Sequence, residues 1–392
     1  MPQLCPELTT KLDSLKQLKQ EFDLEFTKIK NSDSKKSNNL ISIRETKIKL
    51  NQALQEFFKE FPIFGWQEFY GDYPRGLTAV EKKTNYHEVG TFKEDTGAAL
   101  IFLALPDGRI VSGSSDGTIK IWQPDSQGNY KNTQILKGHS NHVFTLQVLP
   151  DGRIVSGCDD STIKIWQSDS QGNYQNTQTL RGHNYGVRAL QVLPDGRIFS
   201  GSMDHTIKIW SPDQQGNYQE SKAFLEHVGQ VWTLQVLPDG RVVSGWGYNS
   251  IYIWQSDSQG NYKNMQTLRG HTNSVFTLQV LPDSRIVSGS LDNTIKIWQP
   301  DSQGKYQNTQ TLEGHTSPVC TLQVLPDSRI VSGSVDKTIK IWQPDSQGNY
   351  QELETLKGHA NSVVALQVLH DGRIVSGGYD NTIKIWDGDK VE

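Results

Sequence analysis

The sequence has few cysteines and no long apolar run. Only three of its 392 residues are cysteines, Cys5, Cys158 and Cys320, and they form neither a CxxC motif nor a disulfide framework. No stretch reaches the roughly 18 apolar residues of a membrane helix. The opening residues, MPQLCPELTTKL, lack the basic start and the apolar core of a signal peptide. We therefore expect a soluble, cytoplasmic protein in a reducing compartment.

The chain also lacks an excess of positive charge. Its formal net charge is −4, and the imbalance lies after residue 84, where 25 basic residues face 31 acidic ones. Proteins that bind the phosphate backbone of nucleic acids do so through clustered lysine and arginine. A mildly acidic main body therefore predicts no nucleic-acid partner, and we expect no membrane partner either.

The sequence is dominated instead by an internal repeat. The motif LPDGR or a close variant begins every 44 residues, at Leu105, Leu149, Leu193, Leu237, Leu281, Leu325 and Leu369. Seven units of this length fill residues 85–392. A fixed period in this range is the signature of a solenoid, a propeller or another repeat array.

Each unit is predicted to form four short strands. In the second unit these are HVFTLQVLP (142–150), RIVSG (153–157), STIKIWQ (161–167) and YQNTQTL (174–180). The first runs apolar, the third is rich in β-branched residues and the fourth is polar, while Asp-Gly and DSQGN sequences supply turns between them. Four strands per unit, with a Gly-His before the first and a Trp ending the third, are typical of a propeller blade.

These motifs make residues 85–392 resemble the WD-repeat β-propellers. Gly-His precedes five of the units, and each unit ends its third strand on a tryptophan, from Trp122 to Trp386, although only Trp386 is followed by Asp. The resemblance implies an all-β, seven-bladed propeller in which residues 85–93 supply the outer strand that the last unit lacks. The near-identity of the units is similar to recently amplified WD-repeat proteins of filamentous bacteria.

Five units contain a His, a Ser and an Asp that could be mistaken for a hydrolase triad. A catalytic site is a single asymmetric constellation, whereas this set recurs at a fixed distance from a Trp. The resemblance implies a structural hydrogen-bonded network, which we assign to His139, Ser156, Asp160 and Trp166 in one unit and to His271, Ser288, Asp292 and Trp298 in another. We predict no enzyme activity, no cofactor and no metal site, since the PDSQGN turns offer too few carboxylates for calcium.

Differences between the units gather in a few columns. These columns lie after the Gly-His, one residue into the first strand, and just before the unit's aspartate, and propeller topology brings all three to one rim of the disc. Loops on a rigid scaffold carry recognition residues, and aromatic residues and arginine are common in binding hot spots. The DSQGNY turns on the other side hardly vary, which favours diversified recognition over drift. The predicted partner-binding residues are His142, Phe144, Arg188, Met203, Trp232, Trp246, Tyr248, Phe276, Leu291, Val335 and Tyr379.

The fourth unit departs most from the others. It reads SGWGYNSIYIW (244–254) where a typical unit reads SGSLDNTIKIW (288–298), so Tyr248 replaces the network aspartate. Its Gly-His is Glu226-His227. We expect Trp246 and Tyr248 to join Trp232 at one point of the rim and to form its hot spot.

The segment before the repeats has a different pattern. Leu8, Leu12, Leu15, Leu18, Phe22, Phe26 and Ile29 recur at helical spacing, and a second apolar face follows the polar break 31–39. Residues 1–60 therefore predict a coiled-coil-like α-helical hairpin, and 61–84 an aromatic-rich connector. Two helices bury little surface alone, so the hairpin would dock on the propeller, self-associate or bind an effector protein.

The function predicted from these features is recognition of a protein or peptide on the rim, with the hairpin coupling recognition to assembly or to an effector. A bacterial signalling or conflict system would be a fitting setting by analogy. A lectin-like propeller, with tryptophan and tyrosine stacked on sugars, is the alternative. An enzyme would need an asymmetric polar pocket, for which the fourth unit offers only Glu226, His227 and Tyr248.

Overall fold

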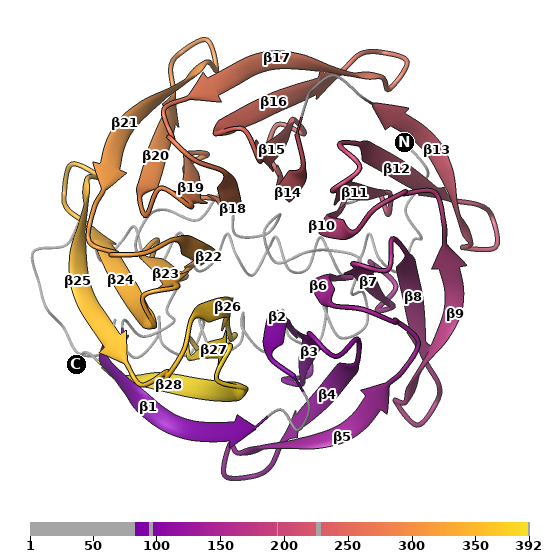
Figure 1. Cartoon of the computed structure of the whole chain (residues 1–392), viewed down its shortest axis with the longest axis horizontal. Helices are drawn as coiled ribbons and strands as arrows, with labels where there is room; N and C mark the ends of the chain where they lie inside the picture. The colour runs from indigo at the N-terminus through magenta and orange to yellow at the C-terminus, as the bar shows by residue number, and fades with distance from the viewer. Residues whose placement is uncertain (1–82, 94–96, 194, 225–228, 391–392) are drawn as a thin grey trace, which may run out of the picture. The chain divides into compact units, whose positions relative to one another are not determined.

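The computed structural model describes residues 83–93, 97–193, 195–224 and 229–390. These residues form 28 strands in seven four-stranded antiparallel sheets, arranged as blades around a central axis (Figure 1). The all-β, seven-bladed prediction is confirmed. The predicted hairpin (1–60) lies outside the described residues, as does the connector (61–84) except for Lys83 and Thr84, so both stay predictions.

Every blade repeats one plan, in which the four strands run from the axis to the rim. Blades 1 to 3 consist of β2(Ala99–Ala104), β3(Ile110–Ser114), β4(Ile119–Pro124) and β5(Tyr130–Leu136); β6(Val143–Val148), β7(Ile154–Cys158), β8(Ile163–Ser168) and β9(Tyr174–Leu180); and β10(Val187–Val192), β11(Ile198–Ser202), β12(Ile207–Pro212) and β13(Tyr218–Phe224).

Blades 4 to 6 consist of β14(Val231–Val236), β15(Val242–Trp246), β16(Ser250–Ser256) and β17(Tyr262–Arg269); β18(Val275–Val280), β19(Ile286–Ser290), β20(Ile295–Pro300) and β21(Tyr306–Leu312); and β22(Val319–Val324), β23(Ile330–Ser334), β24(Thr338–Pro344) and β25(Tyr350–Lys357). Blade 7 combines β26(Val363–Val368), β27(Ile374–Gly378) and β28(Thr382–Lys390) with β1(Lys83–Lys93) from the other end of the repeat array.

The apolar residues pack between neighbouring blades. Leu149, Val155 and Ile163 of blade 2, for example, share one buried cluster with Val187 and Trp210 of blade 3. The strand β7 is buried along its whole length, as expected for a strand with a sheet on both sides. Each blade therefore depends on its neighbours for burial of its faces.

The ring closes through β1, as the sequence predicted. It pairs antiparallel with β28, so that Phe92 lies opposite Ile383 (Figure 1). Lys384 Nζ donates to Glu88 Oε2 at 2.8 Å, and the guanidinium of Arg329 in blade 6 lies 5.7 Å from the ring centre of Tyr86. Strand pairing and contacts between blades thus hold this segment, and β1 covers the edge of β28.

Turns that recur in the units clamp neighbouring blades on one side of the disc. The arginine of each LPDGR-type turn reaches the next blade: Arg153 Nη1 donates to the Gly216 carbonyl at 2.9 Å, and its guanidinium lies 5.6 Å from the ring centre of Tyr218. Arg241 makes the same contacts with Gly304 and Tyr306. Within the DSQGN turn, Asp169 Oδ1 accepts backbone N–H groups from Gln171 and Asn173.

These contacts explain why the DSQGNY turns vary less than the loops on the opposite side of the disc. The near-invariance of the DSQGNY turns was expected to show that exposed loops in this protein do not drift. These turns have a structural role, because their glycine and tyrosine contact the arginine of the preceding blade and their asparagine closes the turn. The contrast alone therefore does not establish that the opposite side is selected for recognition.

Among the described residues, no helix has the length and apolar character that crossing a membrane requires.

Candidate recognition site at the channel mouth

The recurring His, Ser, Asp and Trp form one hydrogen-bonded chain inside each complete blade. In blade 5, Trp298 Nε1 donates to Ser288 Oγ at 2.8 Å, and Ser288 Oγ lies 2.7 Å from His271 Nε2. His271 Nδ1 lies 2.8 Å from Asp292 Oδ2. Both ring nitrogens of the histidine, the serine hydroxyl and the indole N–H are thus engaged within the blade, which gives the set a structural role.

The same arrangement holds the residues of blade 2. Trp166 Nε1 donates to Ser156 Oγ at 2.8 Å, Ser156 Oγ lies 2.7 Å from His139 Nε2, and His139 Nδ1 lies 2.9 Å from Asp160 Oδ2. A threonine completes each network, a role that the sequence did not reveal. Thr162 donates both its backbone N–H and its hydroxyl to Asp160 Oδ1, at 3.0 and 2.6 Å.

The network shifts the ionisation of its aspartates. Burial raises the pKa of the Asp380 carboxyl, but hydrogen bonds from Thr382 and the neighbouring His359 outweigh it and lower that pKa to about 2. The pKa values of Asp160, Asp204, Asp292 and Asp336 are likewise lowered, against burial, by hydrogen bonds from the histidine and threonine of the same blade. These aspartates are anionic acceptors at neutral pH and are not poised as general bases.

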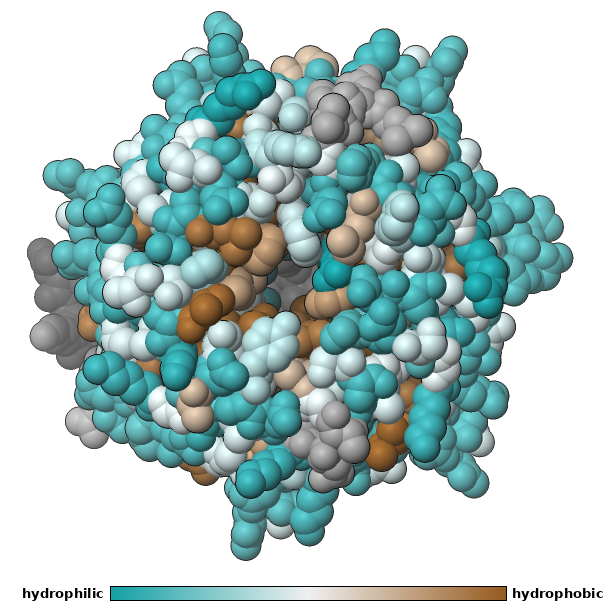
Figure 2. Space-filling model, in the orientation of Figure 1, coloured by the Kyte–Doolittle hydropathy of each residue, from teal (hydrophilic) through white to brown (hydrophobic). Residues whose placement is uncertain are grey.

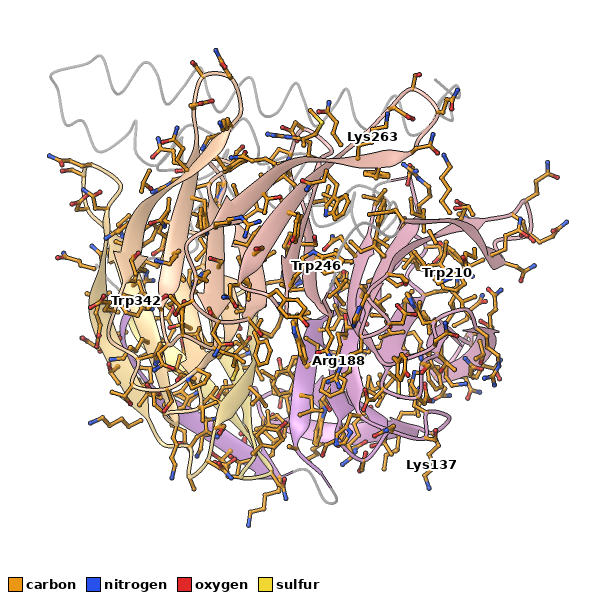
Figure 3. All side chains as sticks on the ribbon, turned by 45° about the horizontal axis from the view of Figure 1, so that its top comes forward. Lys137, Arg188, Trp210, Trp246, Lys263 and Trp342 are labelled. Atoms are coloured by element: carbon orange, nitrogen blue, oxygen red, sulfur yellow. The ribbon has the colours of Figure 1, made fainter. Side chains whose placement is uncertain are left out.

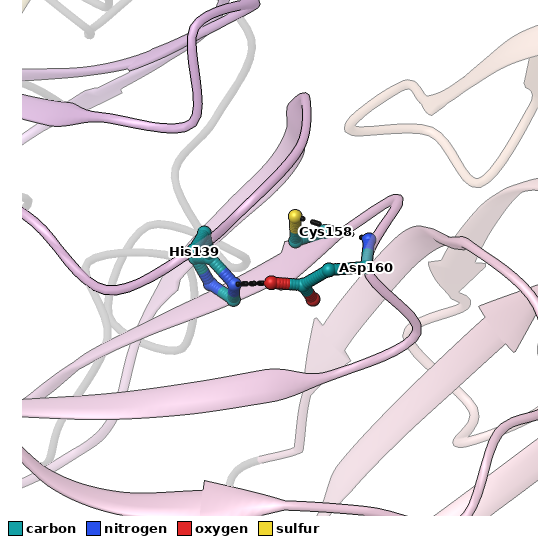
Figure 4. A group of neighbouring side chains, drawn as sticks. All are labelled: His139, Cys158 and Asp160. Carbon is teal, nitrogen blue, oxygen red and sulfur yellow. Dashed lines mark hydrogen bonds and ion pairs between the residues drawn. The ribbon is translucent and has the colours of Figure 1, made fainter.

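Blade 2 contains a cluster that has the composition of a metal site. His139, Cys158 and Asp160 offer ligand atoms within 4.8 Å of one another (Figure 4). The sulfur of Cys158 occupies the position of Ser290 in blade 5: Cys158 Sγ donates to the Asn141 carbonyl at 3.1 Å, as Ser290 Oγ donates to that of Asn273 at 3.0 Å.

The chemistry of this cluster does not fit a metal ion. Burial raises the pKa of the Cys158 thiol to about 12, whereas a metal binds the thiolate. His139 and Asp160 are both engaged in the blade network. The cluster is therefore a variant of the structural network.

The expectation for Trp246 is wrong. Its side chain is only 1% exposed and belongs to the core between blades 3 and 4. Ser244 Oγ accepts hydrogen bonds from two indoles, Trp254 at 2.7 Å and Trp246 at 2.5 Å. Trp246 thus supplies this serine with a second indole donor, whereas Ser288 of blade 5 contacts one indole and one histidine. A large side chain at the end of a buried strand turned inward, because burial of an indole outweighs exposure at the rim.

Tyr248 behaves differently. Its side chain is 63% exposed, so it does lie on the surface. The ring sits over Gly229, where an added Cβ would come within 2.6 Å of Tyr248 Cδ2. The predicted hot spot of Trp232, Trp246 and Tyr248 therefore does not form as one surface cluster. Glu226 and His227, the other candidates for an enzymatic site, lie outside the described residues.

The variable loops do meet on one side of the disc. In each blade, the residue before the network aspartate donates its backbone N–H to the carbonyl just before the inner strand: Met203 to Gly186 at 2.9 Å, Leu291 to Ser274 at 3.0 Å and Tyr379 to Ser362 at 3.0 Å. These bonds join the loop between the second and third strands to the loop that enters the blade. The variable columns are thereby brought together around the axis.

The second residue of each inner strand lines the mouth of the central channel. This ring consists of Leu100, Phe144, Arg188, Trp232, Phe276, Cys320 and Val364. We define the channel mouth as this ring together with Met203, Leu291, Val335 and Tyr379 from the loops above it. Val335 and Tyr379 are exposed, and the other members of the mouth except the buried Leu100 are half-buried. Figure 2 shows hydrophobic surface gathered around the hollow at the centre of the disc.

Arg188 is the centre of a stacked row of side chains at the mouth. Its guanidinium carbon lies 3.6 Å from the ring centre of Phe144 and 5.3 Å from that of Trp232. The Phe144 ring stacks in turn on His142 at 5.6 Å, and Trp232 packs against Phe276 at 4.5 Å. Figure 3 places Arg188 toward the middle of the ring and Lys137 and Lys263 toward its outside. Sequence-predicted residues of blades 2 to 5 are thus in contact.

An ion pair holds Arg188 in place, and its partner was not among the predicted partner-binding residues. Its Nη2 donates to Asp159 Oδ1 of blade 2 at 2.9 Å and contacts Met203 Sδ at 3.0 Å. Asp159 fits because position 186 is glycine: a Cβ there would collide with the Asp159 carboxylate and lie 3.1 Å from its Cα. The signal was available in the sequence, since Asp159, Gly186 and Arg188 are simultaneous departures in neighbouring units.

Comparison with known proteins defines the class. A family profile described as "WD domain, G-beta repeat" matches residues 90–123, 130–167, 174–211, 262–299, 306–343 and 350–387, more than half of the chain. The chain therefore belongs to the WD40 repeat family. The matches omit the segment that contains β14 to β16, in agreement with the departures of blade 4.

Solved structures agree with this assignment. One of them, described as "Crystal structure of WD40 beta propeller domain of Doa1", is 25% identical and superposes with a TM-score of 0.67, covering 78% of this chain and 98% of that one. A search among curated proteins found no match. WD40 propellers are usually non-catalytic scaffolds and typically mediate protein–protein interactions.

Proposed function

We propose that this protein is a non-enzymatic recognition or adaptor protein that binds a protein or peptide partner at the channel mouth. The observation that carries this proposal is the half-buried row from His142 to Phe276 beside the exposed Val335 and Tyr379. Aromatic residues and arginine at the centre of an apolar patch are the composition of binding hot spots.

The remaining parts of the proposal rest on the sequence. We assign the hairpin predicted for residues 1–60 to assembly or effector coupling, and we place the protein in the cytoplasm of a bacterium with amplified WD repeats, in a signalling or conflict system. Neither a nucleic acid nor a membrane is proposed as a partner, because the repeat region is mildly acidic and anionic partners of these kinds are bound through clustered lysine and arginine.

Burial of Trp246 weakens the glycan-binding alternative. Lectin sites stack an exposed aromatic ring on a sugar face, and Trp246, a tryptophan of the predicted hot spot, is only 1% exposed. Tyr185 and Tyr248 are more than 60% exposed and could stack on sugars, but they lie on different blades, and no contact between them supports a shared platform.

The experiment compares partners recovered from the native host by three forms of the full chain. A mouth variant, Val335→Asp with Tyr379→Ala, replaces two exposed side chains of the channel mouth. A matched control, Leu353→Asp with Met265→Ala, replaces exposed side chains on the outer strands β25 and β17. We expect the mouth variant alone to lose the partners of the wild type. Equal recovery by all three forms would show that the mouth is not the binding surface.

A further inference from the structure

Arg188 is incompletely satisfied within the protein. Among the described residues, the acceptors of its guanidinium are Asp159 Oδ1 and Met203 Sδ, both on Nη2. Its Nε is buried without a partner, and so is Nε1 of the neighbouring Trp232. An arginine has five N–H donors, and buried donors without acceptors are rare in folded proteins because each costs about 1–3 kcal/mol. The mouth is therefore short of acceptors.

The charges at the site also favour an added anion. Asp159 is the carboxylate that contacts Arg188, and the two side chains are 25% and 14% exposed. Burial nevertheless lowers the pKa of Arg188, since desolvation outweighs the attraction of Asp159. An anion added to the mouth would stabilise the guanidinium in a place where water screens it little.

A second donor lies across the mouth. Tyr379 of blade 7 and Arg188 of blade 3 both belong to the channel mouth, and each affects the pKa of the other through its charge. Burial raises the pKa of the Tyr379 phenol, so at neutral pH it is protonated and can donate a hydrogen bond. Its side chain is 49% exposed and open to a ligand.

We propose that the channel mouth recognises an acidic side chain, aspartate or glutamate, held between apolar residues of a partner peptide. This inference rests on the proposed function and names the chemistry of the partner. The carboxylate would bind the guanidinium of Arg188 and the Tyr379 hydroxyl, in the charge-assisted geometry that arginine favours. Apolar neighbours on both sides of it would pack on Phe144 and on the Trp232–Phe276 pair. Because apolar residues would pack on both sides of the carboxylate, an acidic residue inside the partner peptide fits this arrangement better than the carboxylate at the end of a chain.

Asp159 acts as the internal competitor for this ligand. It occupies one edge of the guanidinium and is itself one-quarter exposed. A partner carboxylate must bind beside a like charge, which moderates affinity. The structure therefore predicts opposite effects for the two members of the pair. Loss of Arg188 weakens binding, and neutralisation of Asp159 strengthens it.

The test selects peptides from a display library of random linear 12-mers, whose C-termini are fused to the carrier so that only side chains can supply carboxylates. The full-length wild type is expected to enrich peptides that share an acidic residue next to an aromatic or aliphatic one. For a synthetic selected peptide, Arg188→Gln should weaken binding about 10- to 100-fold. Asp159→Asn should strengthen it about 3- to 10-fold. The exposed Arg181 provides the matched control, and Arg181→Gln should leave affinity unchanged.

The outcomes separate this inference from the proposed function. Enriched peptides without an acidic residue, bound equally by wild type and Arg188→Gln, overturn the carboxylate inference and leave recognition at the mouth intact. Weaker binding by Asp159→Asn also overturns it, because that result means that the ion pair only supports the fold. The double variant Asp159→Asn/Arg188→Gln, which keeps a neutral pair, guards against misfolding and should bind as weakly as Arg188→Gln. Failure to enrich any peptide overturns the carboxylate inference, whereas recognition of a folded protein at the mouth is tested by the recovery of partners described above.

Discussion

Replacement of Trp246 by alanine should damage the fold and leave recognition intact. The indole is 1% exposed and lies in the core between blades 3 and 4, against Tyr252 and Trp254 at ring-centre distances of 5.5 and 6.4 Å. Truncation of a buried tryptophan costs about 3–5 kcal/mol. The lost hydrogen bond to Ser244 adds about 1 kcal/mol at most, since Ser244 Oγ keeps the bond from Trp254.

Hydrogen–deuterium exchange of β14, β15 and β16, together with urea denaturation, measures this effect locally. We expect the protection of these strands to fall about a hundredfold or more. Tyr248→Ala is the internal control two residues away. Its ring is 63% exposed, so its loss should change stability by less than about 1 kcal/mol.

The assignment of Trp246 to the core would be refuted by a loss below about 1 kcal/mol with protection unchanged, because a tryptophan at a flexible surface costs that little. Loss of partner binding by a folded Trp246→Ala protein would restore the original expectation that this side chain belongs to the recognition surface. Equal effects of Trp246→Ala and Tyr248→Ala would also contradict the assignment.

Three further predictions concern the blade network, the Arg188 site and the ring closure. Asp292→Ala should lower the free energy of unfolding by about 2–4 kcal/mol, and acidification should weaken all complete blades, as measured by urea midpoints against pH. Because the pKa of these aspartates is lower in the folded protein, their ionisation stabilises the fold at pH values above 3.8, the pKa in the unfolded chain. That stability is lost as the pH falls toward 2. Gly186→Ala should destabilise by about 1–3 kcal/mol through its clash with Asp159, and Asp159→Ala should relieve part of that cost in the double variant. Deletion of residues 1–82 should leave a folded monomeric propeller, whereas deletion of residues 1–93 should expose β28 and cause aggregation in size-exclusion chromatography.

Each of these predictions has a result that contradicts it. Unchanged stability between pH 4 and 2 would mean that the aspartates are not held as anions. Burial also lowers the pKa values of His315 and His359, so a smaller loss of stability should begin as pH falls below their unfolded value of 6.5. Additive effects of Gly186→Ala and Asp159→Ala would show that the two residues do not interact. A soluble, fully folded protein without residues 1–93 would refute closure by β1.

The sequence by itself determined the architecture of the propeller. A 44-residue period, alternating apolar residues and fixed turn sequences specify the strands of each unit, because the LPDGR-type turn recurs seven times and the DSQGN-type turn six times, so that an irregular unit can be aligned with the others. The missing outer strand of the last unit and the leftover strand at 85–93 also identified the closure. The repeated His, Ser, Asp and Trp were recognised as a network for the same reason, since repetition is incompatible with a single active site.

Only the tertiary structure decided what the departures from the repeat mean. Trp246 and Tyr248 are two residues apart on the same unusual segment, yet one is buried and the other exposed, because the fate of each side chain depends on space in the neighbouring blade. Arg188 is held at the mouth by an ion pair with Asp159 of another blade, and Gly186 leaves room for that pair. The periodic pattern describes contacts that every blade repeats, and it carries no information about contacts that occur once. Such single contacts include the stacked row around Arg188 at the channel mouth.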